Sequence, residues 1–180
     1  DRSVSRGLGD VYKRQGTGKT AFALNIMHRL FSDNDNVQCD FFTFEMGQNE
    51  LIKRLISKET RINSMLFVGN NKLSDENKVR ARKSYEDMKN RFDMRVYTSE
   101  YSNLNDIKYA IKQRLSDKRY VVFVDYAGLI TVNDTRKNER QVMNEVTREL
   151  KKLTTDYGIT IVLLAQLSLS LIHISEPTRH

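Results

Sequence analysis

The sequence contains little cysteine, proline or histidine. Cys39 is the single cysteine among 180 residues, which excludes an internal disulfide framework and is compatible with a reducing cytosol. The single proline, Pro177, lies near the C-terminal end. The three histidines lack metal-ligand spacing, so no zinc site is expected. Because Cys39 lies in an apolar, strand-like run, we expect its thiol to be buried as a small hydrophobic group.

Long hydrophobic runs are also missing. No apolar run approaches the roughly 18–20 residues that a membrane-spanning helix needs, and no signal peptide opens the chain. The length suits a single domain with a sizeable core. The formal net charge of +7 at pH 7 permits a polyanionic partner without requiring one.

Apolar periodicity predicts that strands and helices alternate along the chain. Helical spacing is found at 19–31, 48–59, 74–91, 103–115 and 139–157. Strand-like runs are found at 37–44, 94–98, 120–125 and 159–165, while 61–72 is ambiguous. Strands separated by helices of this length are joined by right-handed crossovers in a parallel sheet. We therefore predict an α/β fold with a mostly parallel sheet flanked by helices.

A glycine-rich turn, Gly16-Thr17-Gly18-Lys19-Thr20, runs directly into an apolar helical segment. Such a turn directs backbone N–H groups and the positive end of the helix dipole at one spot, where phosphates bind. In a P-loop, Lys19 would contact the β- and γ-phosphates and the Thr20 hydroxyl would be a Mg²⁺ ligand. The alternative is a solvent-exposed turn, which does not need lysine and threonine in this order.

The P-loop pattern is incomplete on its N-terminal side. The first glycine of G-x-x-x-x-G-K-[ST] falls five positions before Gly18, where this sequence has Lys13. The apolar strand that normally precedes the loop is not found in residues 1–15. Both ends of the chain resemble translated sequencing-adapter read-through. We therefore interpret 1–15 and 169–180 as foreign sequence and 16–168 as the domain; the alternative is a pair of divergent but genuine termini.

Polar residues follow three of the predicted strands. Glu45, Asp125 and Gln166 each stand at the carboxyl end of a strand-like run. In open parallel sheets, ligands bind at this edge, which is also where a P-loop lies. We therefore predict a single nucleotide site at the carboxyl edge of the sheet.

Each of these residues has a functional interpretation and a simpler structural one. Asp125 is typical of a Walker B acid that holds Mg²⁺, but an aspartate at a strand end is also a common turn or cap residue. Glu45 is the candidate general base for the water that attacks the γ-phosphate, or a cap for the next helix. Gln166 would hydrogen-bond the γ-phosphate or the attacking water, or satisfy loop backbone.

Three cations flank a polar loop near the same edge: Arg136, Lys137 and Arg140. They would contact a nucleic-acid backbone or a neighbouring subunit. The simpler interpretation is a solvated loop, which is the more common role of such charges.

Four blocks of sequence carry a family resemblance. They are GTGKTAFALNI, FTFEMGQNELIKRL, VVFVDYAGLI and NERQVMNEVTRELKKLTTDYGITIVLLAQLS. In this order and spacing they resemble the ATPase domain of DnaB-type replicative DNA helicases, and the second and fourth blocks are far more specific than the P-loop. The resemblance implies a RecA-like P-loop NTPase fold and a hexameric, ATP-driven motor that unwinds DNA in the 5′→3′ direction.

The resemblance also implies the roles of individual residues. Lys19 and Thr20 match the P-loop lysine and the Mg²⁺ threonine, and Asp125 matches the Walker B aspartate. Glu45 matches the glutamate that activates water, and Gln166 the glutamine that senses the γ-phosphate. The implied ligands are ATP, held by Gly16, Thr17, Gly18, Lys19, Thr20 and Asp125, and Mg²⁺, held by Thr20 and Asp125.

The implied partners are single-stranded DNA at a replication fork, further copies of the chain in a homo-hexamer, primase and a helicase loader. The implied location is the cytoplasm of a bacterial cell or of a phage-infected host, without a membrane. Two alternatives remain open. One is a RecA- or KaiC-like ATPase, against which the block around Glu45 argues. The other is a nucleotide-binding regulatory module without turnover, against which the presence of both Glu45 and Asp125 argues, since a pure binder needs no general base.

The departures from the family pattern lead to a first prediction. Because the P-loop strand is not recognisable, and the family's DNA-binding loops and arginine finger follow Ser168, the 180-residue chain should be inactive by itself. A sheet that lacks the strand has unpaired backbone edges, so we expect weak ATP affinity and poor solubility. Thermal unfolding with and without Mg-ATP checks this, and a cooperative transition that Mg-ATP raises by several degrees would contradict it.

Overall fold

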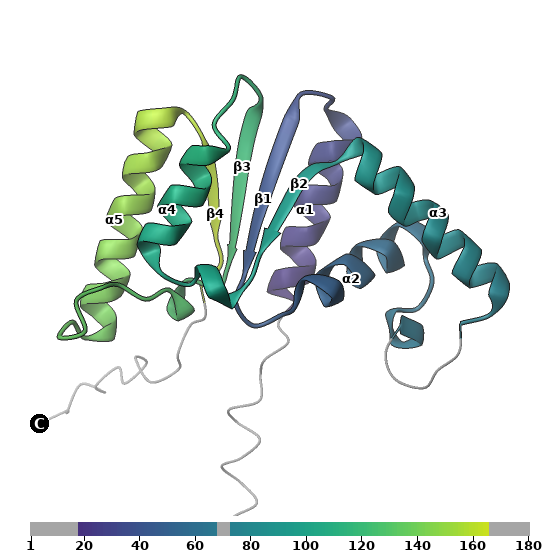
Figure 1. The fold of residues 1–180 in the computed structure, drawn as a ribbon, viewed down its shortest axis with the longest axis horizontal. Coiled ribbons are helices and arrows are strands. Elements are labelled where there is room, and N and C mark those ends of the chain that lie inside the picture. The colour runs from purple at the N-terminus through teal and green to yellow at the C-terminus, as the bar shows by residue number, and fades with distance from the viewer. Residues whose placement is uncertain (1–17, 68–72, 166–180) are drawn as a thin grey trace, which may run out of the picture.

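A computed structural model of the chain describes residues 18–67 and 73–165. A central sheet has helices on both faces, as Figure 1 shows. The elements in chain order are α1 (Lys19–Asp33), β1 (Val37–Thr43), α2 (Gln48–Thr60), η1 (Ser64–Phe67), α3 (Asp75–Arg91), β2 (Asp93–Tyr97), η2 (Ser99–Tyr101), α4 (Leu104–Gln113), β3 (Arg119–Asp125), η3 (Ala127–Leu129), α5 (Glu139–Tyr157) and β4 (Thr160–Leu163).

The described strands form a parallel sheet in the order β2-β1-β3-β4. The predicted alternation of strands and helices and the predicted parallel sheet are therefore confirmed. The strand arrows in Figure 1 all point to the end of the molecule at which α1 begins. Residues before Gly18 lie outside the described part, so the expected absence of a P-loop strand stays a prediction.

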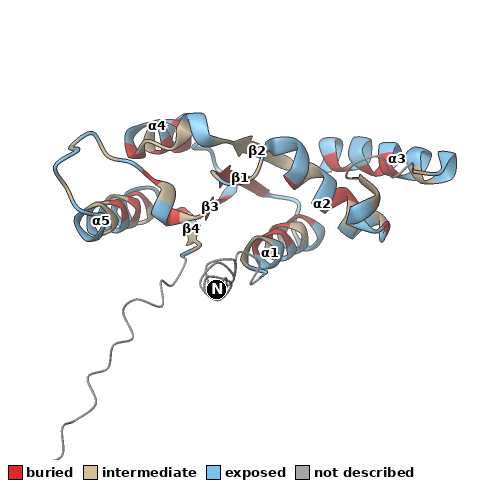
Figure 2. Ribbon diagram, turned by 90° about the horizontal axis from the view of Figure 1, so that it is seen from below, coloured by how far each residue is buried: buried red, intermediate tan, exposed pale blue. Residues whose placement is uncertain are grey.

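Alternate side chains of the central strands fill two separate cores. Cys39 and Phe41 of β1 pack with Phe123 of β3 against α1, α2 and α3. Phe42 of β1 and Val122 of β3 pack on the opposite face against α4 and α5. In Figure 2 the buried residues line the sheet and the helix faces turned toward it. Since β1 is buried along its whole length, both of its faces must be covered, as expected for a central parallel strand.

The predicted burial of Cys39 is confirmed, because its side chain is fully enclosed. Burial, helped by the negative charges of Asp40 and Asp93, raises the pKa of the thiol to about 12. The thiol is therefore protonated and unreactive at neutral pH, as a packing group should be.

Capping residues fix several of the helix ends. The Ser74 side chain accepts a hydrogen bond from the Asn77 amide at the start of α3, and the Asn103 side chain caps α4. Gly158 ends α5 with a φ of 65°, the left-handed conformation that glycine adopts readily at a helix end. The predicted helix at 103–115 was too long at its C-terminal end: α4 ends at Gln113, so Leu115 lies beyond it.

The residue that follows the end of α4, Arg114, belongs to a buried ionic cluster at the amino-terminal edge of the sheet. The Asp40 carboxylate is fully buried and accepts hydrogen bonds from Tyr120 Oη at 2.6 Å and from Arg114 Nε at 3.2 Å. Arg114 Nη2 also donates to Asp93 Oδ1 at 2.9 Å, and Lys118 Nζ donates to Asp93 Oδ2 at 2.7 Å. Arg114, as the C-cap residue of α4, thus connects the helix end to β1 and β2.

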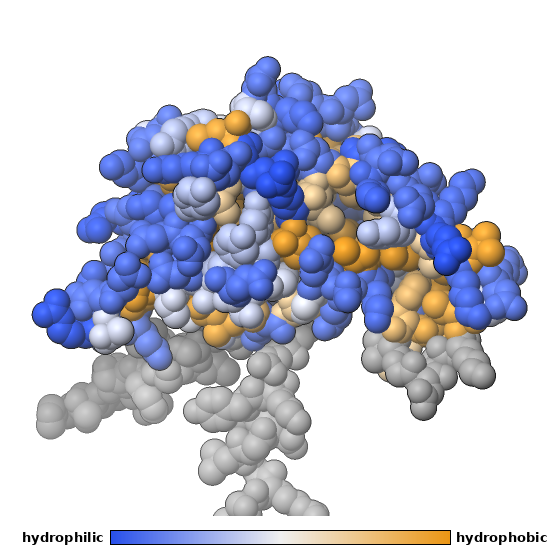
Figure 3. All heavy atoms as spheres, viewed as in Figure 1, coloured by the Kyte–Doolittle hydropathy of each residue, from blue (hydrophilic) through white to orange (hydrophobic). Residues whose placement is uncertain are grey.

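The surface is mainly hydrophilic on the face shown in Figure 3. Large exposed apolar side chains include Phe22 on α1, Val79 on α3 and Tyr109 on α4, which lie on three different helices. Single exposed apolar residues of this kind are normal on protein surfaces. Within 18–67 and 73–165, no helix is long and apolar enough to cross a membrane.

The ionic cluster leads to a prediction about stability. Arg114→Ala would leave the buried Asp40 carboxylate without its cation, and such losses typically cost about 3–5 kcal/mol of unfolding free energy. Lys118→Ala removes a half-exposed partner of Asp93 and should cost only about 0–1 kcal/mol. Urea unfolding of both variants in the full-length gene product checks this, and equal losses would contradict it.

Candidate nucleotide-binding site

The carboxyl ends of three strands are held together by backbone hydrogen bonds beyond the strands themselves. The Phe44 amide, just after β1, donates to the Asp125 carbonyl at the end of β3 at 3.0 Å. The Leu164 amide, just after β4, donates to the Val124 carbonyl at 2.9 Å, and the Ala127 amide donates to the Leu164 carbonyl at 2.9 Å. The segments that leave the sheet at this edge therefore have fixed positions.

The first turn of α1 lies at the same edge. Gly18 is the N-cap residue, with a φ of 75° and no side-chain cap, so the backbone enters the helix from the left-handed region that glycine tolerates best. Lys19 and Thr20 follow as the first helical residues. The first turn of α1 thus presents its amides and the side chains of Lys19 and Thr20 to the carboxyl edge of the sheet.

A side-chain hydrogen bond joins α1 to β3. The Thr20 hydroxyl donates to Asp125 Oδ2 at 2.5 Å, and Asp125 is only 6% exposed. The cap interpretation of Asp125 does not hold, because the following 3-10 helix has Tyr126 as its N-cap and no side-chain cap hydrogen bond. A hydroxyl oxygen and a carboxylate oxygen are therefore adjacent at the start of α1.

The Lys19 ammonium reaches across the same edge toward β4. Its Nζ donates to the Ala165 carbonyl at 3.1 Å and lies 5.8 Å from the centroid of the Tyr126 ring. No sequence pattern predicted either of these two contacts of Lys19. An aromatic residue directly after the strand-end Asp125 is the one signal that could have pointed to Tyr126.

Glu45 lies in the exposed turn between β1 and α2. It does not cap α2, whose N-cap is Gly47 without a side-chain cap hydrogen bond. In the described part of the chain, its carboxylate takes part in no hydrogen bond or ion pair. Burial, and then the negative charge of Glu45, raise the pKa of the Tyr126 phenol, so the carboxylate lies near that ring.

The structure therefore brings four of the predicted site residues to one edge of the sheet: Lys19, Thr20, Glu45 and Asp125. Gly18 is also at this edge, while Gly16, Thr17 and Gln166 lie outside the described residues. The catalytic and ligand-binding roles given to all of these residues stay predictions.

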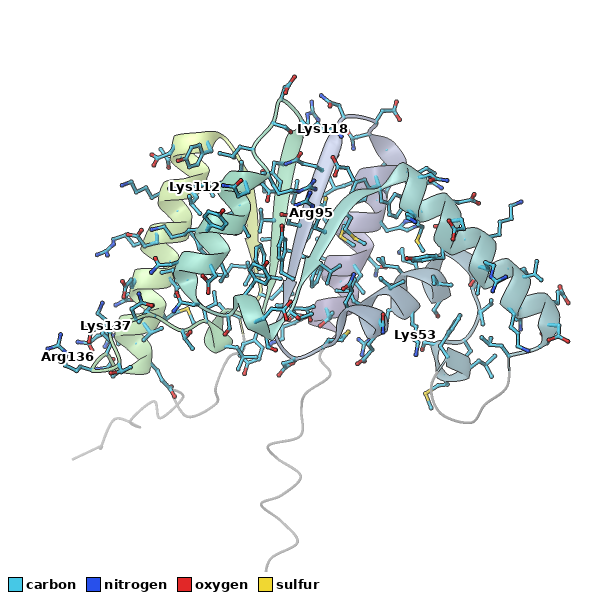
Figure 4. All side chains as sticks on the ribbon, viewed as in Figure 1. Lys53, Arg95, Lys112, Lys118, Arg136 and Lys137 are labelled. Atoms are coloured by element: carbon cyan, nitrogen blue, oxygen red, sulfur yellow. The ribbon has the colours of Figure 1, made fainter. Side chains whose placement is uncertain are left out.

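Arg136 and Lys137, which precede α5, each pair with an acidic residue nearby in the sequence. Arg136 Nε donates to Asp134 Oδ1 at 3.0 Å, and Lys137 Nζ donates to Glu145 Oε2 at 2.7 Å. Figure 4 shows Arg136 and Lys137 at the tip of this loop, at the far left of the molecule. These contacts favour the simpler interpretation of a solvated loop.

The oxygen pair of Thr20 and Asp125 fits a hard divalent cation such as Mg²⁺, which prefers oxygen ligands and is usually held by one or two protein groups, water and substrate phosphates. Between residues 18 and 165, apart from the undescribed 68–72, no group of three or more His, Cys, Asp or Glu side chains could hold a metal ion. An ion at this edge would therefore depend on oxygens from phosphate and water to complete its shell.

Comparison with known proteins decides the family. The sequence profile of the DnaB-like helicase C terminal domain matches residues 10–174. The chain belongs to this family. The match extends a few residues into both segments that the sequence suggested to be foreign, and the limits of those segments stay predictions.

Curated relatives of this DnaB-like domain are replicative helicases. The chain is 27% identical over 160 residues to the replicative DNA helicase DnaB of Helicobacter pylori, covering 88% of the chain and 32% of the relative. It is 29% identical over 163 residues to the replicative DNA helicase DnaC of Bacillus subtilis, covering 88% of the chain and 35% of the relative. The chain thus spans about a third of the length of these relatives.

Solved structures agree with the fold of the DnaB-like domain. One of them, described as an ATPase domain, superposes with a TM-score of 0.72 at 24% identity, over 87% of this chain and 55% of that one. A DnaB-like replicative helicase, described with its interactions with primase, superposes with a TM-score of 0.73 at 24% identity, over 87% of this chain and 38% of that one. The predicted RecA-like fold class is confirmed.

The backbone of the turn leads to a prediction with a matched control. Gly18 and Gly158 both have positive φ, 75° and 65°, and an added Cβ at either position meets no atom within 4 Å. Alanine at either position should therefore cost about 1–2 kcal/mol through backbone conformation alone. We expect Gly18→Ala also to weaken ATP binding, measured by calorimetric titration of the full-length gene product, while Gly158→Ala does not. Equal ATP affinities would contradict a phosphate-binding role for the turn.

Proposed function

We propose that this domain is the ATP-binding and ATP-hydrolysing core of a replicative DNA helicase. The observation that carries the proposal is the hydrogen bond between Thr20 and Asp125. It joins the start of a glycine-led helix to the acid at the end of a buried strand, as a Mg-nucleotide site requires. Membership of the DnaB-like helicase family and the names of the curated relatives support the same activity.

ATP is the proposed substrate, and its phosphates would lie at the Gly18 turn. Lys19 would exchange the Ala165 carbonyl for phosphate oxygens, which are stronger partners for an ammonium because they carry charge. Thr20 and Asp125 would hold Mg²⁺, which would supply positive charge to offset the charge that develops on the phosphate oxygens. The amides at the start of α1 add a fixed positive field at the same place.

Glu45 is the proposed general base. Its exposed carboxylate is unpaired within the described residues and stands at the edge where the γ-phosphate would lie, so it can align a water molecule and accept its proton. Gln166, outside the described residues, is proposed to contact the γ-phosphate and to couple hydrolysis to DNA-binding segments encoded beyond this chain. Gly16 and Thr17 are proposed to complete the phosphate-binding turn.

The assembly and the partners are further parts of the proposal. Single-stranded DNA at a replication fork, a homo-hexameric ring, primase and a helicase loader are the proposed partners, and the cytoplasm is the proposed location. A DnaB-like structural relative is described with its interactions with primase, which supports that contact. Forked-DNA unwinding by the full-length gene product distinguishes a helicase from a RecA- or KaiC-like ATPase and from a binding module without turnover.

The site makes a prediction that separates binding from chemistry. In the full-length gene product, Lys19→Ala should abolish detectable ATP binding. Glu45→Gln should preserve binding while ATP turnover falls by about 10²–10⁴, the usual contribution of a general base.

A matched control is Glu50→Gln on α2, because Glu50 is also an exposed glutamate and its partner is Arg54 at 2.8 Å. This variant should keep wild-type turnover. Steady-state phosphate release and nucleotide titration are the measurements. Wild-type turnover by Glu45→Gln would show that the base is assigned wrongly, and binding without any turnover in the wild-type protein would favour the regulatory module.

A further inference from the structure

The Lys19 side chain is held in place by two groups of the protein itself. Lysine has a long, flexible stem, and fixing it costs side-chain entropy. Here the ammonium donates to the Ala165 carbonyl at 3.1 Å and lies over the Tyr126 ring, 5.8 Å from its centroid. This separation is within the roughly 6 Å over which an aromatic face attracts a cation.

The position of the Tyr126 ring is itself fixed by its surroundings. Tyr126 follows Asp125 directly, and the next residue, Ala127, is buried and donates its amide to the Leu164 carbonyl at 2.9 Å. The backbone on both sides of Tyr126 is therefore anchored to the sheet edge. The ring cannot move away from Lys19 by a simple shift of the chain.

Gly128 provides the room that the ring needs. A Cβ at this position would lie 2.7 Å from Cε2 and 3.2 Å from Cδ2 of Tyr126. The first distance is far below van der Waals contact, so any larger residue would displace the ring. Because Gly128 has no positive φ that would demand glycine, close approach of the ring is the reason for glycine here.

We propose that Tyr126 is a positioning residue for the phosphate-binding lysine, and that Gly128 is required because it leaves space for the ring. The inference rests on the proposed ATPase function. The ring and the Ala165 carbonyl together hold the ammonium at the phosphate-binding edge, so that less ordering is left to occur when ATP binds. Such preorganisation strengthens binding without changing the chemical step.

The first test compares two substitutions at position 126 in the full-length gene product. Tyr126→Leu removes the aromatic face but keeps an apolar side chain, and should weaken binding of a non-hydrolysable ATP analogue by about two- to fivefold, the usual strength of an exposed cation–π contact. KM for ATP should rise by a similar factor while kcat is unchanged. Tyr126→Phe keeps the aromatic face and should bind the analogue as the wild-type protein does.

Gly128→Ala provides a second, independent test because it displaces the ring without removing it. It should weaken analogue binding as much as Tyr126→Leu, and the double variant Tyr126→Leu/Gly128→Ala should be no weaker than Tyr126→Leu alone. Tyr109→Leu, at an exposed tyrosine on α4, is the matched control and should have no effect. Circular dichroism confirms that each variant is folded.

The outcomes separate this inference from the proposed function. If the wild-type protein binds and hydrolyses ATP while Tyr126→Leu and Gly128→Ala bind the analogue as tightly as it does, the positioning role is wrong and the function stands. Tighter binding by Tyr126→Leu also overturns it, since the ring would then compete with phosphate for the lysine. If the wild-type protein does not bind the analogue, both the function and the inference are wrong.

Discussion

The parallel pairing of β1 with β3 sets the positions of both hydrophobic cores and of the acids at the carboxyl edge of the sheet. Its register places Thr43 opposite Asp125, so the two strands end at the same level. The chain after β1 is then tied to β3 by the hydrogen bond from the Phe44 amide to the Asp125 carbonyl. Glu45 and Asp125 reach one edge for this reason, and the opposite faces of the same two strands supply the centres of both hydrophobic cores.

The two edges of the sheet carry polar groups of different kinds. At the amino-terminal edge, Asp40, Arg114 and Tyr120 satisfy one another inside the protein, so these three groups are not available to a ligand. At the carboxyl edge, Lys19 contacts the Ala165 carbonyl and the Tyr126 ring, and an uncharged carbonyl is a weaker partner for an ammonium than a charged oxygen would be. The charged groups that stabilise the fold and those of the proposed ligand site therefore lie at opposite ends of the strands.

Much of the fold could be predicted because its signals are local. The continuous apolar run before Asp125 and the helical spacing at 74–91 and 139–157 each extend over a short stretch of chain, and the structure has β3, α3 and α5 there. The end of α4 was missed for a physical reason. Arg114 takes its partners from Asp40 and Asp93, which no pattern within the helix itself contains.

Local sequence patterns specify the helices and strands, the glycine-led turn before α1 and the acids after β1 and β3, because periodicity, capping and turn chemistry are short-range properties of the chain. The strand order β2-β1-β3-β4 and the contacts between distant segments follow instead from how the whole chain packs. Thr20 meets Asp125, and Lys19 meets Tyr126, across more than a hundred residues of intervening chain. Such contacts depend on the register and twist of the whole sheet, which neighbouring residues in the sequence do not specify.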